Sequence, residues 1–430
     1  MKIKDTIKRI PLVKYFIEHY KIWNQNIEYK RLLQDTFTID NRIKAKVQNH
    51  EKINITFICY RPAVWGSLKT VYESLLKNQL FNVNIVSIPK MSFDRSHIES
   101  EGAEEYFEKY NAIKGFSNGK YFDLKALNPD FVFYQQPYNL VLPNEYQSSI
   151  VAKYARICYI DYFSFNDNVK SFDVFYGCVP KDFMKSVSLY FVQSDIEREL
   201  ISKWMEDTPN IVKYIKAGYP KYDNVDSLKG AESNIWHSRN GMFRIIWTPR
   251  WCTNENNCHF FLYKDKFLEF VKSNKQIDFI FRPHPQSWFE WNRTGEFTFD
   301  QANQYKAKYD EIVNAQIDNS KEYLKMFYSS DCLVTDLSTI IPEYLLTGKP
   351  IIYCDSYDSK HGYLKDKGYG KSFYWAYTWE DVENYINMLI SGSDPKREER
   401  ERYIKSDFFL GGKTAGDLIT ESIIEFVMKR

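Results

Sequence analysis

The chain has 430 residues, of which 44% are hydrophobic, 17% aromatic and 27% charged, and its formal net charge is +2. A chain of this length exceeds what one hydrophobic core usually spans, so we expect two domains. The near-zero charge gives no reason to expect a nucleic-acid partner. The seven scattered cysteines, without a secretory signal, are typical of reduced thiols in a cytoplasmic protein. No apolar run reaches the roughly eighteen residues of a membrane span.

The first predicted element is a basic amphipathic helical arm over residues 1–50. Lysine and arginine outnumber acidic residues in its first 34 positions, with Ile, Leu, Val, Phe and Trp between them. Such a helix either lies on an anionic cytoplasmic membrane surface or packs against the body of the protein. The sequence leaves both interpretations open.

An alternation of strands and helices predicts a first α/β domain over residues 51–225. Its strand candidates, rich in β-branched and aromatic residues, are Ile53–Tyr60, Val83–Ile88, Phe131–Gln135, Ala155–Tyr162, Ser188–Ser194 and Ile211–Gly218. Helical spacing over Trp65–Asn78 separates the first two. Strands that alternate with helices favour a parallel sheet covered on both faces, and the Gly- and Pro-containing turn Gly218–Val225 is expected to end the domain.

The alternation then restarts and predicts a second α/β domain over residues 226–405. Strands are expected at Phe243–Arg250, at Ile277–Pro285, at Cys332–Val334 and after Pro350, with helices between them. Residues 406–430 are expected to form a closing helix that packs back on the first domain. The predicted fold class is α/β, with two Rossmann-like doubly wound parallel-sheet domains facing a cleft and an N-terminal helical arm.

Three loops of the second domain carry chemistry. They are Thr248–Trp251, Arg282–Pro285 and Asp336–Thr339, and each follows a predicted strand. Because ligands of open parallel sheets bind at the carboxyl ends of the strands, we expect these loops to form one site.

The hydroxyl pair Ser338 and Thr339 precedes a predicted helix. Either residue would cap that helix, whose N-terminal N–H groups and positive dipole end favour an anion such as phosphate. The same pair is equally typical of a plain cap with nothing bound. Glu343, about one turn further on, is placed to accept hydrogen bonds from a ribose diol, or is a glutamate at the edge of the core.

The second loop brings a histidine to the same edge. His284 lies between two prolines, two residues after Arg282, so an imidazole and a guanidinium leave one strand end. Arg250 follows another strand and would add a fixed positive charge. We expect Arg250, Arg282 and His284 to bind an anionic ligand.

These motifs resemble the CDP-glycerol glycerophosphotransferase family, whose members build teichoic acids on a two-Rossmann glycosyltransferase-B (GT-B) scaffold. "SDCLVTDLSTIIPEYLLTGKPIIYCDSYD" is similar to the family's "sD.LITDYSS..FDy....kPiifY..D", "FRPHP" to its "R.HP", and "AGYPKYD" to its "GYPRND". The resemblance implies that Ser338, Thr339 and His284 bind the nucleotide pyrophosphate and that Glu343 faces the ribose.

The sequence departs from the family pattern at two places. "TPRWC" has Arg250 before the tryptophan, whereas the family's "APTWR" has its arginine after it. The family's "WHGTPLK" segment, whose histidine is the expected base, has as its counterpart "CYIDYFSFN", where Asp161 is the nearest candidate.

The resulting hypothesis is a transferase that moves a glycerol-phosphate or related polyol-phosphate unit from a CDP-linked donor to a hydroxyl of a glycan or lipid-linked acceptor. Asp161 and His284 are its predicted catalytic residues. The hypothesis requires neither cofactor nor metal, and Cys252, Cys258 and His259 lack the second ligand pair of a zinc site.

Two alternatives remain. One is a GT-B glycosyltransferase that uses a UDP- or CMP-linked sugar in capsule, O-antigen or teichoic-acid synthesis. The other is a non-catalytic scaffold of the assembly complex, which the missing histidine motivates.

Overall fold

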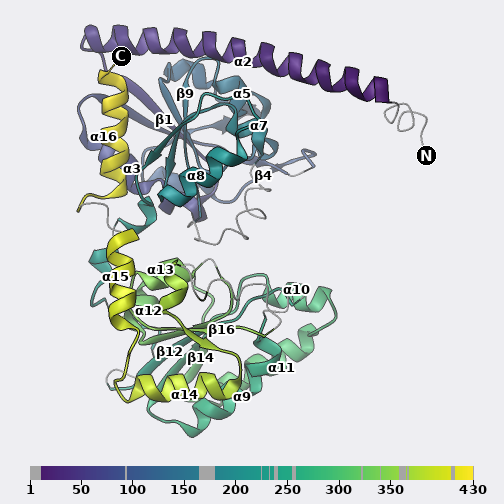
Figure 1. The fold of residues 1–430 in the computed structure, drawn as a ribbon, viewed down its shortest axis with the longest axis vertical. Coiled ribbons are helices and arrows are strands. Elements are labelled where there is room, and N and C mark those ends of the chain that lie inside the picture. Colours follow the sequence, from purple (N-terminus) through teal and green to yellow (C-terminus); the bar gives the residue numbers. More distant parts are fainter. Residues whose placement is uncertain are drawn as a thin grey trace. The chain divides into compact units, whose positions relative to one another are not determined.

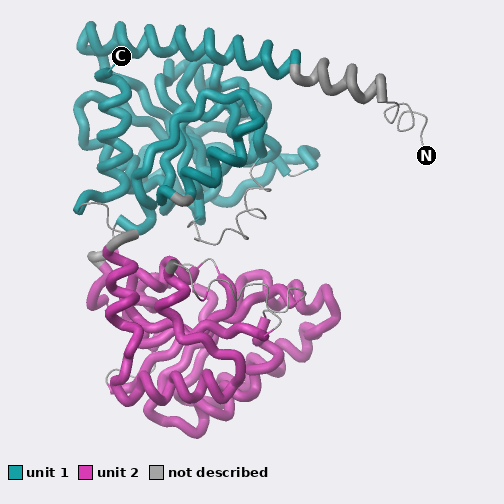
Figure 2. The backbone as a smooth tube through the Cα atoms, in the orientation of Figure 1, with its two compact units in different colours: residues 1–165, 169–223, 410–430 teal, residues 166–168, 224–409 magenta. Residues whose placement is uncertain are grey.

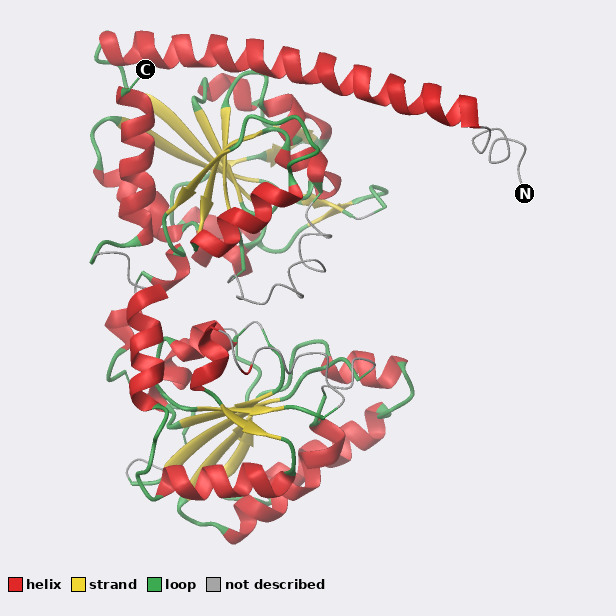
Figure 3. Ribbon diagram, viewed as in Figure 1, coloured by secondary structure: helices red, strands yellow, loops and turns green. Residues whose placement is uncertain are grey.

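The computed structural model divides the protein into two compact units. Unit 1 comprises residues 1–165, 169–223 and 410–430, and unit 2 comprises residues 166–168 and 224–409 (Figure 2). The described residues are 11–92, 94–163, 180–223, 225–231, 233–236, 241–253, 258–320, 323–338, 340–357, 365, 368–407 and 412–429. Each unit holds one parallel sheet between helices (Figures 1 and 3).

The sheet of unit 1 has seven parallel strands in the order β11-β10-β9-β8-β1-β2-β5. The strands are β1 (Ile53–Cys59), β2 (Phe81–Ser87), β5 (Ile113–Lys114), β8 (Phe131–Tyr134), β9 (Arg156–Ile160), β10 (Val187–Val192) and β11 (Lys213–Lys216). Two short antiparallel pairs join β3 (Lys90–Met91) to β4 (Ile98–Glu99) and β6 (Phe116–Ser117) to β7 (Lys120–Tyr121).

The helices of unit 1 cover both faces of its sheet. They are α2 (Pro11–Gln48), α3 (Lys69–Lys77), α4 (Ala103–Glu108), α5 (Ser148–Val151), α7 (Lys181–Met184), α8 (Asp195–Trp204) and α16 (Ala415–Met428). Strand alternation gives one face the stacked rings of Phe57 and Phe133, 4.7 Å between centroids. Tyr134, Tyr159 and Tyr190 belong to the core of the other face.

The C-terminal helix α16 closes unit 1 against α3. Gly416 is required at this contact, because a Cβ there would lie 2.6 Å from the backbone of Thr70. Asp223, the last residue of the "AGYPKYD" motif, accepts hydrogen bonds from the N–H groups of Ala415 (2.6 Å) and Gly416 (2.9 Å). That motif aspartate therefore fixes the start of α16 on the first half of the chain.

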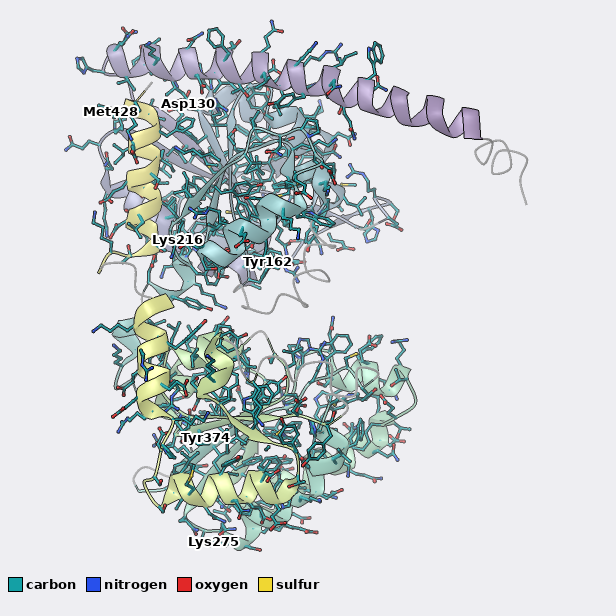
Figure 4. The ribbon with its side chains drawn as sticks, viewed as in Figure 1. Asp130, Tyr162, Lys216, Lys275, Tyr374 and Met428 are labelled. Atoms are coloured by element: carbon teal, nitrogen blue, oxygen red, sulfur yellow. The ribbon has the colours of Figure 1, made fainter. Side chains whose placement is uncertain are left out.

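The long helix α2 is held to unit 1 by buried ion pairs. The Asp130 carboxylate is fully buried and accepts from Arg42 Nε (3.0 Å), Lys46 Nζ (2.5 Å) and the N–H of Asn54 (2.8 Å). Figure 4 shows Asp130 beside α2. The second half of the predicted arm thus packs on the body of unit 1. Among the described helices, none combines the length and apolar character needed to cross a membrane.

The sheet of unit 2 has six parallel strands in the order β14-β13-β12-β15-β16-β17. They are β12 (Phe243–Thr248), β13 (Ile277–Phe281), β14 (Ala315–Ile317), β15 (Cys332–Thr335), β16 (Ile351–Cys354) and β17 (Tyr374–Ala376). Its helices are α9 (Phe260–Ser273), α10 (Ser287–Arg293), α11 (Phe299–Asp310), α12 (Leu324–Ser329), α13 (Ile341–Leu345), α14 (Trp379–Ile390) and α15 (Arg397–Asp407).

Numbered along the chain within unit 2, these strands lie in the order 3-2-1-4-5-6, which is the order of a doubly wound Rossmann sheet. Unit 1 follows the same order with a seventh strand at its edge. The predicted fold class, two Rossmann-like parallel-sheet domains with N-terminal helical structure, is confirmed. Ligands of such sheets bind where the winding direction reverses, which in unit 2 is between β12 and β15.

Candidate functional site

The loops after β12 and β15 meet at the winding reversal of unit 2. The N–H of Arg250 donates to Asp336 Oδ2 (2.9 Å), and the Arg250 guanidinium donates to the carbonyl of Leu337 (3.2 Å). Arg250 and Leu337 belong to the two loops that the sequence singled out. The structure therefore brings a guanidinium to the residue before Ser338.

His284 lies on the other side of Arg250, after β13, and its side chain is exposed. Its ring stacks on Trp251 with 5.8 Å between centroids. The N–H of Gln286 donates to its Nδ1 (3.2 Å), so the neutral ring carries its proton on Nε2. Desolvation of the ring, and then the charge of Arg250, lower the pKa of His284 below 6.5. The residue is a neutral N–H donor at pH 7.

A buried contact between a carboxylate and an imidazole, Asp336 and His259, lies beside the Arg250 loop. Asp336 is fully buried, and His259 is 3% exposed. Asp336 accepts from the backbone N–H of His259 (3.0 Å) and lies 2.8 Å from His259 Nδ1, in addition to its bond from Arg250. From the sequence, His259 was named only as a member of an incomplete set of zinc ligands. Within the described parts of the chain, no cluster of three or more His, Cys, Asp or Glu side chains could hold a metal ion.

The predicted helix cap at Ser338 is wrong. Helix α13 begins at Ile341, its N-cap is Ile340, and no side chain caps it. Ser338 Oγ instead accepts a long bond from the N–H of Ile340 (3.4 Å) within the turn. Proline at position 342 supplies no N–H, so the helix starts later than the hydroxyl pattern indicated. Ser338 stays half-buried beside the Arg250 contact, and Thr339 lies outside the described residues.

Arg282 and Glu343 belong to a separate chain of contacts. Arg282 forms an ion pair with Asp318 and lies over the ring of Tyr323, 4.5 Å from its centroid. The Tyr323 hydroxyl donates to Glu343 Oε2 (2.6 Å), and Glu343 is 7% exposed. Arg282 is half-buried and already paired with a carboxylate, whereas Arg250 contacts the loop of Ser338 and His284 stacks on Trp251.

In unit 1, Asp161 follows β9 and is 1% exposed. The single hydroxyl of Tyr190 lies 2.7 Å from Asp161 Oδ2 and 3.1 Å from Glu197 Oε1. One hydroxyl proton cannot serve two ionised carboxylates, so the pair of acids holds at least one further proton. Burial, and next to it the charge of Asp161, hold the pKa of Glu197 well above its usual range. Burial therefore favours Glu197 as the neutral member of the pair.

Asp161 lies at the same edge of its sheet as the winding reversal of unit 1. There Gln135 Oε1 accepts from the N–H groups of Tyr60 (2.7 Å) and Arg61 (2.8 Å). Tyr162, next to Asp161, lies at the end of the sheet away from Asp130 (Figure 4) and forms a 3.0 Å hydroxyl contact with Tyr138. This edge of unit 1 is thus lined by tyrosines and amides.

Sequence analysis missed Glu197, Tyr190 and the Asp336–His259 pair. Asp336 was detectable, because a carboxylate directly after a buried parallel strand lies at the ligand edge. Glu197 gave no comparable signal, since an acid in the first turn of a helix is ordinary.

Solved structures similar to this chain share its fold. A putative UDP-N-acetylglucosamine 2-epimerase from Listeria monocytogenes is 11% identical, with 88% of this chain and 98% of that chain covered and a TM-score of 0.56. The UDP-GlcNAc 2-epimerase from Neisseria meningitidis, bound to UDP-GlcNAc, is 13% identical, with 88% and 100% covered and a TM-score of 0.55. The wall teichoic acid polymerase TagF is 13% identical, with 97% and 98% covered and a TM-score of 0.49.

No curated protein sequence matches this chain. A family model does match, that of CDP-glycerol:poly(glycerophosphate) glycerophosphotransferase, over residues 190–409. This region spans just over half of the chain. It includes the loops of Arg250, His284 and Ser338. The family that the motifs predicted is confirmed, and the protein belongs to the CDP-glycerol:poly(glycerophosphate) glycerophosphotransferase family.

Proposed function

We propose that the protein transfers a glycerol-phosphate or related polyol-phosphate unit from a CDP-activated donor to a hydroxyl of a cell-surface glycan or lipid-linked acceptor, with release of CMP. The observation that carries this proposal is the bond of the Arg250 guanidinium to the Leu337 carbonyl beside Ser338, at the winding reversal of unit 2, with His284 stacked on the next residue, Trp251. A guanidinium, a neutral imidazole N–H and a hydroxyl together suit the oxygens of a pyrophosphate.

In the proposed reaction, the acceptor oxygen attacks the distal phosphorus of the donor. The new P–O bond forms as the bond to the bridging oxygen breaks in line with it, and CMP leaves with the negative charge. Arg250 and His284 stabilise that charge, since both are held in place before the reaction. Thr339 and Arg282 remain proposed phosphate ligands, and Glu343 a proposed ribose ligand, on the family motif alone.

The proton of the acceptor hydroxyl goes to Asp161 in this proposal. The raised pKa of Glu197 supports this role, because a neutral Glu197 beside the shared Tyr190 hydroxyl leaves Asp161 as the ionised acid of the pair. A carboxylate in this position replaces the histidine of the family's "WHGTPLK" segment.

The alternative is a glycosyltransferase that uses a nucleotide sugar. The likeness to an epimerase solved with UDP-GlcNAc favours it, because the same fold there holds a UDP-sugar. Both functions need the same pyrophosphate contacts, so the donor must be identified by binding.

A donor panel separates the candidates. Ligands that bind the native state raise its melting temperature, so we expect CDP-glycerol or CDP-ribitol to stabilise the full chain and UDP- or CMP-sugars not to. Stabilisation by a UDP-sugar alone would select the glycosyltransferase. CMP release on addition of a teichoic-acid or glycan acceptor then tests catalysis, and binding of a donor without turnover would select the scaffold.

The proposal also places the protein at the inner face of an anionic membrane. On the described part of α2, Trp23, Leu33 and Phe37 are 59%, 43% and 67% exposed. Lys30 and Lys44 are exposed on the same helix. Apolar rings between cations suit a surface of anionic lipid headgroups, where a lipid-linked acceptor would be found.

A further inference from the structure

We propose that His259 is a positively charged positioning residue of the donor site, which holds Asp336 in the orientation that places the Arg250 loop. This inference rests on the proposed function, because it assigns the donor nucleotide to that site. His259 would not touch the donor itself. It acts through the Asp336 carboxylate and the backbone of residue 250.

Asp336 connects three parts of the site. One of its oxygens, Oδ2, accepts from the N–H groups of Arg250 (2.9 Å) and His259 (3.0 Å), and the other lies 2.8 Å from His259 Nδ1. The next residue along the loop, Trp251, stacks on His284. A single carboxylate orientation therefore determines where both the guanidinium and the imidazole of the donor site lie.

Two buried aspartates act on His259. Asp336 is 0% exposed and Asp355, at the end of the neighbouring strand β16, is 1% exposed. Neither carboxylate oxygen of Asp355 has a hydrogen-bond partner among the described residues. An imidazolium at position 259 would compensate the buried charge of Asp336, whose oxygen lies 2.8 Å from the ring nitrogen.

The direction of the pKa shift of His259 agrees with a charged ring. Burial alone lowers the pKa of His259, but the charge of Asp336 and the hydrogen bond to it raise the pKa above its ordinary value of 6.5, with a further contribution from Asp355. Hence the stabilisation from the charged contact between His259 and Asp336 is fully present below pH 6.5. It is lost as the pH rises through the folded-state pKa of His259.

The thiols and phenols around His259 stay neutral over the pH range in which His259 titrates. Tyr263, whose ring stacks on His259, and Cys258 have pKa values raised by burial and by Asp336. Burial likewise raises the pKa of Cys354 and of Tyr353, both on β16. Arg250 remains charged. His284 has a lowered pKa, so His259 is the group of this cluster that loses its charge as the pH rises through a pKa above 6.5.

The test measures the charge of His259 and the affinity for CDP separately. The full chain is labelled on histidine, and the resonance that disappears in His259→Gln is followed by NMR from pH 5.5 to 9. Binding of CDP is measured by calorimetry between pH 7 and 9, where the terminal phosphate, with a second pKa of about 6, is fully ionised. His97→Gln is the matched control, because His97 is exposed in unit 1 and also lies near a carboxylate, Glu99 at 3.3 Å.

We expect the His259 resonance to report an imidazolium at pH 7 that titrates only above it. Wild-type affinity for CDP should fall about tenfold from pH 7 to 9, and His259→Gln should bind about tenfold more weakly at pH 7 with no pH dependence, since a charge-assisted contact is lost. His97→Gln should behave as the wild type. A neutral His259 at pH 6.5, or wild-type affinity in His259→Gln, would overturn the inference. Absence of CDP binding by the wild type at any pH would instead refute the proposed function, and the NMR titration would still decide the charge of His259.

Discussion

Replacement of His284 tests whether the donor site works through a neutral imidazole. The N–H of Gln286 occupies Nδ1, and the pKa of His284 is lowered by desolvation and by Arg250, so the ring offers only its Nε2–H. Removal of one preorganised donor to a developing oxyanion costs about 10²- to 10³-fold in kcat, or about 2.7–4 kcal/mol. Because the side chain is exposed and Arg250 shares the charge, we expect the lower end, about 100-fold, for His284→Ala.

The variant series separates a neutral donor from an acid. His284→Gln keeps an N–H near the position of Nε2, so it should recover activity to within about tenfold of the wild type. CMP release is measured from CDP-glycerol between pH 5.5 and 7, with His97→Ala as the control. Wild-type kcat should rise with pH through the pKa of His284 and then level off. Activity that falls over this range would mean that the protonated ring is the active form, and a His284→Ala enzyme within about threefold of the wild type would refute the site assignment.

Three further outcomes follow from the structure. Asp161→Asn should lose at least about 100-fold in turnover, while Glu197→Gln should stay within about threefold of the wild type, because glutamine reproduces the neutral acid. Equal losses in the two variants would contradict this proton assignment. Asp130→Ala should lower the free energy of unfolding by about 3–5 kcal/mol in urea titrations, since it leaves Lys46 buried without its partner, and a change below about 1 kcal/mol would show that the arm is held otherwise. Serine at Phe37 should reduce sedimentation with anionic vesicles in a salt-dependent manner without a change in melting temperature, and unchanged sedimentation would remove the membrane from the proposal.

Much of the fold was predictable because its signals are local. The β-branched and aromatic runs at β1, β8, β10 and β12 correspond to strands within one or two residues, since buried parallel strands must be apolar throughout. The short edge strands β14 and β17 were not predicted. Three residues at the edge of a sheet carry too little apolar pattern to distinguish them from a loop.

The site was predictable only where a motif and a strand end coincide. Arg250 and His284 follow strands directly, so the topology alone brings them to one edge. The predicted Ser338 cap was wrong because a serine hydroxyl can also bond to the backbone within a turn, without starting a helix. Glu197 and His259 could not be identified, because their roles depend on the charge of a partner far away in the sequence.

The two sheets share a strand order but use their winding reversals differently. In unit 2, the reversal is lined by Arg250 and stabilised by an ion pair below it, which suits an anion. In unit 1, the side chain of Gln135 bonds across the reversal to the backbone of Arg61, so the loops there are tied to each other. The buried acid of that edge, Asp161, lies at the end of β9, the strand next to β8. A common sheet topology therefore determines which edge of each unit gathers these side chains, while single residues at the reversal set its chemistry, a guanidinium in unit 2 and a carboxamide in unit 1.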